Sequence, residues 1–322
     1  MRETPVSSGS SGWRLHFFEI KISITNQRAV LPYSGMLTDT HAHLDFPDFA
    51  SDLDDILARA AAAGVTRILS IGTSVESSRR AVALAEKYPQ VFAVIGVHPN
   101  SADEAAPGFI EELRALAQSP RVVGLGETGL DYHRLPGTTP RADLEAVGGA
   151  VITGEPGDLS IEVRATALKN AQAIVFEQQL DLAAELGLNV VIHERDAWDD
   201  TVSILKNHTG RLRAVFHCFG KAPAQADEIR ALGHLVSFTG IVTFQNAQTA
   251  QETARTVPGD AFMVETDCPF LAPAPHRGKR CEPAHTRLVA EHIARLRGEP
   301  LATLAASTEA TASAFFRFPP GR

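Results

Sequence analysis

The sequence lacks the features of a disulfide-rich or membrane-spanning protein. Its three cysteines, Cys218, Cys268 and Cys281, form no CxxC pair and no even set, which argues against a disulfide framework and a thiolate zinc finger. No apolar run approaches the roughly 20 residues that cross a bilayer, and the N-terminus lacks the pattern of a signal peptide. We therefore expect a cytoplasmic protein that makes no use of a membrane.

An excess of positive charge is also absent. Lysine and arginine number 30 against 38 aspartates and glutamates, which gives a net charge of −8. This balance disfavours a protein that holds nucleic acid through a broad basic surface, although an enzyme can still bind phosphate through bound cations. The densest basic patch is RGKR at residues 277 to 280. The apolar fraction of 44% over 322 residues is enough for a full core.

From Met36 onward, short apolar runs alternate with segments in which apolar residues recur every three or four positions, as they do in a helix. The preceding residues, 1–35, show no sustained periodicity, and we predict an N-terminal extension that is not part of the core. The predicted strands are 36–43, 66–72, 91–99, 121–131, 189–195, 213–220, 234–240 and 262–269. Short apolar strands that alternate with helices indicate a parallel sheet covered on both sides.

The number of strands predicts how this sheet is arranged. Eight strands close a (β/α)₈ TIM barrel, and residues 36–322 fit the usual size of about 250 residues with one insertion, so we predict a single barrel domain. The alternative is an open doubly wound sheet. That fold carries a GxGxxG turn after its first strand, and the sequence has none there.

One connection in the predicted barrel is unusually long. Residues 134–165, after the fourth strand, are rich in glycine and proline, whereas such loops usually have about 2 to 6 residues. In a barrel this insertion would leave from the C-terminal face, where catalysis takes place. We interpret it as a hairpin or flap over the site, with a plain mobile insertion as the alternative.

Titratable residues gather at the C-terminal ends of the predicted strands. The first two, His41 and His43 in THAH, are two residues apart and would project from the same strand face, about 7 Å from one another. The full set is His41, His43, His98, Glu127, His193, His217 and Asp267. Each taken alone could be a cap, a buried core histidine or an ion pair, but in a barrel all of them meet at the catalytic mouth.

The residue types in this set predict a metal site. Imidazoles and carboxylates without thiolates suit Zn²⁺, Mn²⁺ or a related divalent ion. The set exceeds what a single ion needs and is enough for two ions about 3.5 to 4 Å apart that share a bridging carboxylate.

Seven motifs in chain order carry a resemblance to a known family. They are THAHLDF, GVHP, GETGLDY, VIHERDA, FHCFG, SFTGIVTFQNA and ETDCPFLAP, between residues 40 and 273. In these the chain resembles the TatD family of metal-dependent deoxyribonucleases, which are (β/α)₈ barrels of the amidohydrolase superfamily. The resemblance implies hydrolysis of phosphodiesters with one or two divalent ions (Mg²⁺, Mn²⁺ or Zn²⁺), the activity being 3′ to 5′ exonuclease digestion, chiefly of single-stranded DNA.

The resemblance also implies roles for individual residues. One ion would be held by His41, His43 and Asp267, and a second by His193 and His217. Glu127 would bridge the two ions. His98 would face the substrate, and Arg277 would contact phosphate. Beside the metal and its water, Asp267 is our candidate for the general base, with a role as ligand alone as the alternative. Glu265 lies two residues earlier on the same strand face, and we expect it to hydrogen-bond a ligand.

The chain departs from the family pattern in the insertion after strand four, which would alter the substrate that fits, and at two further places. Asn100 stands in GVHPN where the family has histidine, and Cys281 and His285 stand in RCEPAH where the family has asparagine and tyrosine. We expect Asn100 to weaken a phosphate or proton contact, and Cys281 and His285 to change the substrate contacts of the RCEPAH loop.

Two other functions are weighed against the nuclease. The first is hydrolysis of a small amide, lactone or aminoacyl ester, where the metals are often bridged by a carboxylated lysine on strand four; here that strand offers Glu127 and no lysine. The second is a metal-binding or nucleic-acid-binding scaffold without turnover, which would not require a complete set of ligands.

Overall fold

Eight parallel strands form the centre of the structure. In this computed structural model the described residues are 36–136 and 159–319. The strands are β1 (Leu37–Ala42), β2 (Val65–Ile71), β3 (Val91–Ile95), β4 (Val122–Asp131), β5 (Val190–Arg195), β6 (Ala214–Phe216), β7 (Leu235–Phe238) and β8 (Phe262–Val264). They pair in chain order from β1 to β8, each parallel to the next.

The sheet closes on itself where β1 meets the segment that follows β8. Ala42 and Cys268 form a parallel bridge, and the backbone N–H of His43 donates to the Cys268 carbonyl over 2.8 Å. The Asp267 N–H donates in turn to the His41 carbonyl, also over 2.8 Å. The predicted (β/α)₈ TIM barrel is therefore confirmed.

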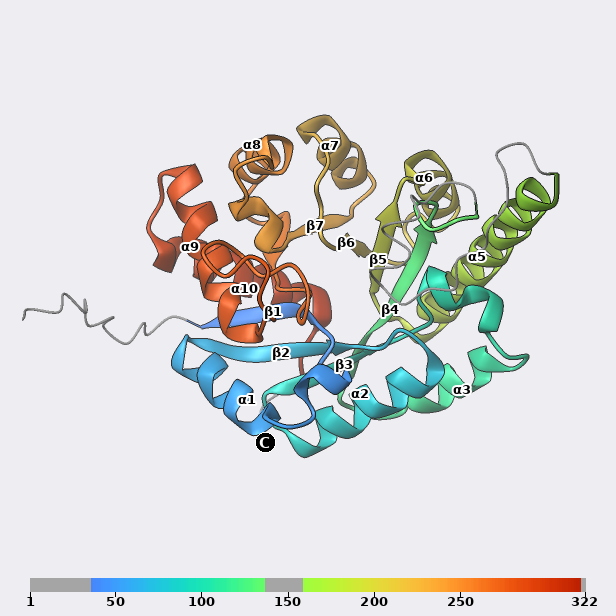
Figure 1. The fold of residues 1–322 in the computed structure, drawn as a ribbon, viewed down its shortest axis with the longest axis horizontal. Coiled ribbons are helices and arrows are strands. Elements are labelled where there is room, and N and C mark those ends of the chain that lie inside the picture. The colour runs from blue at the N-terminus through green and yellow to red at the C-terminus, as the bar shows by residue number, and fades with distance from the viewer. Residues whose placement is uncertain (1–35, 137–158, 320–322) are drawn as a thin grey trace, which may run out of the picture. The chain divides into compact units, whose positions relative to one another are not determined.

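Helices lie around the strands, as Figure 1 shows. The α-helices are α1 (Leu53–Ala62), α2 (Val75–Lys87), α3 (Phe109–Leu116), α5 (Leu159–Leu186), α6 (Trp198–Lys206), α7 (Pro223–Ala231), α8 (Gln248–Thr256), α9 (Thr286–Arg297) and α10 (Leu301–Phe316). Short 3₁₀ helices are η1 (Pro47–Phe49), η2 (Pro99–Glu104), η3 (Gly240–Thr243) and η4 (Pro283–His285). In the described ranges no helix combines the length and the apolar character that a membrane crossing requires.

Several predicted boundaries were wrong. Strands three, six and eight end at Ile95, Phe216 and Val264, earlier than predicted, so that His98, His217 and Asp267 lie just past the strands and not within them. The physical reason near the last two is that Cys218 and Asp267 have φ of 50° and 60°, in the left-handed region, which ends an extended strand.

The predicted insertion was also too long at its C-terminal end. Helix α5 begins at Leu159, so residues 159–165 are helical and not part of a loop. Residues 160–165 are exposed or half-buried, so no buried apolar face marks this first part of the helix. The rest of the insertion, 137–158, and the predicted extension 1–35 lie outside the described residues.

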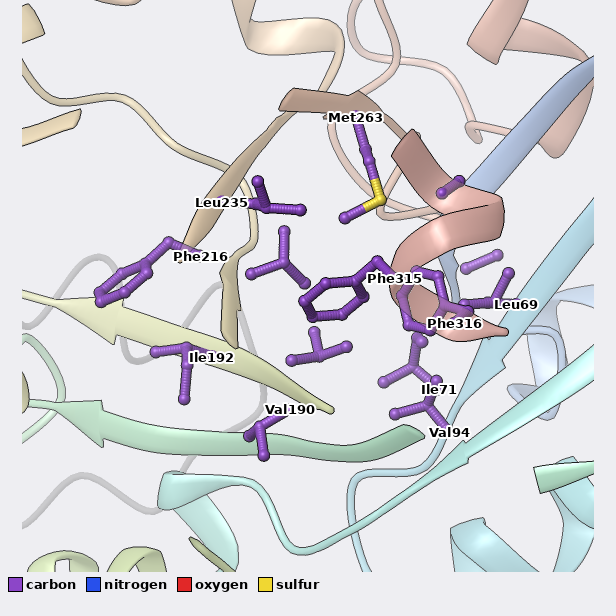
Figure 2. Close-up of a cluster of buried hydrophobic side chains, with 14 of the residues drawn as sticks. Leu69, Ile71, Val94, Val190, Ile192, Phe216, Leu235, Met263, Phe315 and Phe316 are labelled. Carbon is purple, nitrogen blue, oxygen red and sulfur yellow. The ribbon is translucent and has the colours of Figure 1, made fainter. Parts of the chain in front are cut away.

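The C-terminal helix α10 covers the N-terminal ends of the strands. Near these ends Glu309 accepts a hydrogen bond from Thr38 of β1 and pairs with Arg67 of β2, and the Asn189 side chain, just before β5, donates to the Phe315 carbonyl over 2.6 Å. Figure 2 shows Phe315 and Phe316 among apolar side chains of the strands. These side chains include Leu69, Ile71, Val94, Val190, Ile192, Phe216, Leu235 and Met263. The N-terminal end of the barrel is thus filled, and the C-terminal end is left for polar groups.

Candidate metal centre

Glu127 of β4 lies at the centre of a cluster of histidines at the C-terminal end of the barrel. Its side chain is buried, and its two carboxylate oxygens face different partners. Oε1 lies 2.8 Å from His193 Nδ1 and 2.8 Å from His217 Nε2. Oε2 lies 3.3 Å from His41 Nε2 and 3.8 Å from His43 Nε2. Each oxygen of one carboxylate therefore faces its own pair of imidazoles.

Asp267 completes the cluster on the side of β1. Its Oδ1 lies 3.3 Å from His43 Nε2 and 3.6 Å from His41 Nε2. The Asp267 backbone has φ of 60°, and such a conformation costs of order 1 to 3 kcal/mol for a residue other than glycine. The hydrogen bond from its N–H to the His41 carbonyl holds the backbone in place. The carboxylate is thus fixed against the same two imidazoles by the seam that closes the barrel.

The donor set fits a divalent metal ion. Three triplets of side chains have ligand atoms within 4.8 Å of one another. The first is His41, His43 and Asp267, the second is His41, Glu127 and His217, and the third is His98, Glu127 and His193. Both ring nitrogens of His41 are buried and make no hydrogen bond with any described residue. An unpaired buried nitrogen is costly, and a cation is the partner that a neutral imidazole next to carboxylates can bind.

The carboxylates and imidazoles of the cluster shift one another's pKa values. Burial by itself raises the pKa of Glu127, but the adjacent His217, His98 and His41 outweigh it and hold this pKa well below its usual value. Burial lowers the pKa of His41, and the neighbouring His217 lowers it further. Burial raises the pKa of Asp267 too, and the hydrogen bond with His43 and the nearby imidazoles again bring it below its usual value. The carboxylates are therefore ionised at neutral pH, as metal ligands must be.

Glu265, predicted to support a ligand, lies on the other side of His217 from Glu127. Its Oε1 is 3.6 Å from His217 Nδ1 and accepts a hydrogen bond of 2.7 Å from the Cys218 N–H. Its Oε2 accepts one of 2.6 Å from the Ser237 hydroxyl. The His217 ring thus lies between two buried carboxylates, with its Nδ1 at ion-pair distance from Glu265 and without a hydrogen bond to a described residue.

Asp131, at the end of β4, is a site residue that the sequence reasoning missed. Its Oδ2 lies 3.2 Å from His193 Nε2, the ring nitrogen that faces away from Glu127. The side-chain amide of Gln172 accepts from the Asp131 N–H over 2.9 Å and donates to the Asp131 carbonyl over 3.0 Å. A signal was available, because Asp131 follows Glu127 by four residues in the same strand and so shares its face.

His98 and Asn100 are joined at the start of η2. His98 Nδ1 accepts a hydrogen bond of 3.0 Å from the Asn100 N–H, and its Nε2 lies 3.5 Å from Glu127 Oε1. Burial, with the charge of His193, lowers the pKa of His98 to about 3. A neutral ring whose Nδ1 accepts must carry its hydrogen on Nε2, so His98 presents a donor to the cluster. The Asn100 side chain also donates to Asp131 over 3.3 Å.

The remaining sequence-based candidates are Arg277 and two residues of the RCEPAH loop, Cys281 and His285. Arg277 is exposed, with its guanidinium 4.4 Å from the centre of the Phe244 ring, and it makes no hydrogen bond or ion pair with a described residue. Cys281 Sγ is 3.5 Å from His285 Nδ1, and the His285 ring stacks on that of His276 at 4.6 Å. The RCEPAH loop is also tied to other segments, because Arg280 pairs with Asp52 and Glu282 with Arg59.

Most of the chain matches the model of one known protein family. Residues 38–317 match the family model described as TatD related DNase. The chain belongs to the TatD family. It is accordingly a metal-dependent hydrolase, and the sequence resemblance and the enzyme class are both confirmed.

The relatives of this TatD-family chain match it over almost their whole length. A Bacillus subtilis protein named uncharacterized metal-dependent hydrolase YabD is 35% identical over 283 residues, 88% of this chain and 99% of that protein. An Erwinia tasmaniensis protein named 3′-5′ ssDNA/RNA exonuclease TatD is 33% identical over 285 residues, 86% of this chain and 98% of its own length. The crystal structure of YjjV, a TatD homolog from Escherichia coli K12, is 28% identical with a TM-score of 0.73, and the match covers 88% of this chain and 98% of that one.

Proposed function

We propose that this TatD-family hydrolase is a 3′ to 5′ exonuclease of single-stranded DNA that works with two divalent ions. The observation that carries the proposal is the position of Glu127, whose two oxygens face two separate histidine pairs, as a carboxylate shared between two ions would. The relative from Erwinia tasmaniensis, named as an exonuclease of single-stranded DNA and RNA, supports the choice of substrate.

The chemistry of a phosphodiester explains why such a centre is needed. The anionic phosphate repels an attacking oxygen, and the leaving oxygen must be stabilised as its charge develops. Divalent ions held by His41, His43, Glu127, His193, His217 and Asp267 would supply positive charge and a water of lowered pKa. The protein would contribute the fixed positions of these ligands.

Asp267, which is also a ligand, would act on the attacking water, and His98 would act on the substrate. Asp267 has 15% of its side chain exposed, whereas His41 and Glu127 have 0% and 3%, so it is the carboxylate most open to the mouth. Ionised because of its lowered pKa, it would accept the proton of the attacking water as general base. His98 would donate its Nε2–H to a phosphate oxygen.

The test is to remove the metal and return single ions. The chelated protein is given Mg²⁺, Mn²⁺ or Zn²⁺ in turn, and a 5′-labelled single strand is followed for shortening from its 3′ end. We expect stepwise release of mononucleotides with at least one ion and none without metal, with Asp267→Asn as the inactive control. Hydrolysis of a small ester or amide, with no shortening under any ion, would contradict the proposal and favour the amidohydrolase alternative.

A further inference from the structure

Phe270 is an exposed aromatic side chain next to the candidate metal centre. The large hydrophobic side chains that are exposed in the described ranges are Met36, Val163, Ile174 and Phe270, and Phe270 is the aromatic one among them, with 52% exposure. It follows Asp267 by three residues, and its N–H donates to the Asp267 carbonyl over 3.0 Å. A hydrophobic ring is therefore held in solvent at the mouth of the barrel.

The backbone around Phe270 is held on both sides. The Pro269 carbonyl accepts a hydrogen bond of 2.9 Å from the Cys281 N–H. Leu271 has φ of 53°, and its carbonyl lies so close to Gly240 that a Cβ added there would be 2.1 Å away. The exposed ring is thus presented by a fixed segment, which lowers the entropy lost when a ligand packs on it.

The Phe270 ring contacts the rings of Phe46 and His43, and His43 belongs to the candidate metal centre. His43 stacks on Phe46, with ring centres 4.8 Å apart and planes at 22°. Phe46 meets Phe270 edge to face, with centres 6.0 Å apart at 80°, and Phe270 lies 6.4 Å from His43. Since His43 Nε2 is beside Asp267, a group stacked on Phe270 would lie next to the reacting phosphate.

We propose that Phe270, supported by Phe46, is a stacking platform for the nucleobase of the nucleotide whose phosphate is hydrolysed. This inference rests on the proposed nuclease function. Every nucleobase has a π-face, so stacking on an aromatic ring binds single strands of any sequence. The net charge of −8 makes a broad electrostatic attraction for the DNA backbone weak, which increases the importance of stacking.

The platform is tested with strands that lack one base. The holoenzyme and its Phe270→Ala variant are compared on an oligonucleotide with normal 3′-terminal residues and on strands with an abasic residue at the last or at the penultimate position. We expect Phe270→Ala to lower kcat/KM on the normal strand by about 5-fold to 100-fold, mainly through KM. On the strand that lacks the stacked base the variant and the wild type should be equal. Phe270→Trp should retain the wild-type preference.

Val163→Ala, on α5, is the matched control, because it also truncates an exposed hydrophobic residue and should change nothing. If the wild type shortens single strands and Phe270→Ala keeps the full wild-type preference for a base at both positions, the platform is wrong and the nuclease function stands. Equal losses on all strands would also refute the platform. If the wild type shortens no strand at all, the proposed function fails and the platform with it.

Discussion

The two ends of the barrel are built from the same strands and differ in almost every physical respect. At the N-terminal end, Phe315 and Phe316 of α10 are buried among apolar side chains. At the C-terminal end, the same strands lead into histidines and carboxylates that face one another across a few ångströms. Strand β6 illustrates the change, because buried Phe216 is followed at once by His217. The difference teaches that stability and activity are assigned to opposite ends of each strand.

The polar end also carries strained backbone and a buried acid. Cys218 and Asp267 adopt left-handed backbone conformations there, with φ of 50° and 60°. Burial raises the pKa of Asp39 to about 8, although the Thr266 hydroxyl donates a hydrogen bond of 2.7 Å to its carboxylate. Such costs are tolerated where a site requires a fixed geometry, and the packed opposite end offsets them.

Replacing Asp267 by asparagine should show the largest loss of activity. The substitution keeps the size of the side chain but removes the proposed base and a ligand charge beside His43, so we expect kcat to fall by about 10³-fold or more. The midpoint of thermal unfolding should remain close to that of the wild type, since no packing is lost. A rate near that of the wild type, measured by mononucleotide release, would exclude Asp267 both as base and as an essential ligand.

A substitution at the N-terminal end of the barrel should lower stability and leave activity unchanged. Phe315 is fully buried, and Phe315→Ala should lower the free energy of unfolding by about 3 to 5 kcal/mol, measured by denaturant titration. In the absence of denaturant kcat per folded molecule should be unchanged. The same truncation at the mouth, Phe270→Ala, should leave stability nearly intact because that ring is half exposed. A reduced kcat in folded Phe315→Ala would break the separation of the two ends.

Much of the fold follows from local patterns in the sequence. The alternation of apolar segments and helical spacing predicts the eight strands and their order, because a short parallel strand covered on both sides must be apolar throughout. What the pattern does not contain is the point where a strand leaves the ladder. The residues after Phe216 and Val264 mix polar and apolar types, and nothing in their pattern shows that the backbone turns at Cys218 and Asp267.

Some residues of the candidate site can likewise be predicted from local sequence patterns, and others cannot. The histidines and Glu127 can be found from the sequence because barrel topology brings all strand ends to one face. Asp131 acts on His193 of the next strand, and that contact depends on the pairing of β4 with β5, in which Gly129 lies opposite His193. Likewise, the contact of Asn100 with both His98 and Asp131 depends on the turn into η2. The strand face that Asp131 shares with Glu127 can be inferred from the sequence, but these contacts also depend on three-dimensional register, which a single sequence does not give.

Asp131→Asn should have an intermediate effect at the mouth. Without its charge the far nitrogen of His193 loses an ionic partner, and a group of this kind typically contributes about 10-fold to 100-fold in metal affinity or activity. We expect the metal concentration for half-maximal activity to rise, and high metal to restore part of the rate. The matched control is Asp196→Asn, whose exposed carboxylate pairs with His133 at 2.9 Å. A loss that is independent of metal concentration would show that Asp131 stabilises the fold and does not position the ligand.

Arg277→Ala should give the smallest effect and decides whether the phosphate contact extends to the rim of the mouth. The guanidinium is exposed, lies over Phe244 and makes no ion pair with a described residue, so its charge is available to a backbone phosphate. A single contact of this kind should lower kcat/KM by less than about tenfold and leave kcat unchanged. It should also reduce the slope of log kcat/KM against log salt by about 0.7, the value for one phosphate of a single strand.

Arg230→Ala on α7, which removes an arginine paired with Asp227 at 3.1 Å, is the control that should keep the wild-type slope. If both variants keep that slope, Arg277 only packs on Phe244, and recognition of the strand is confined to the metal centre and the rings beside it.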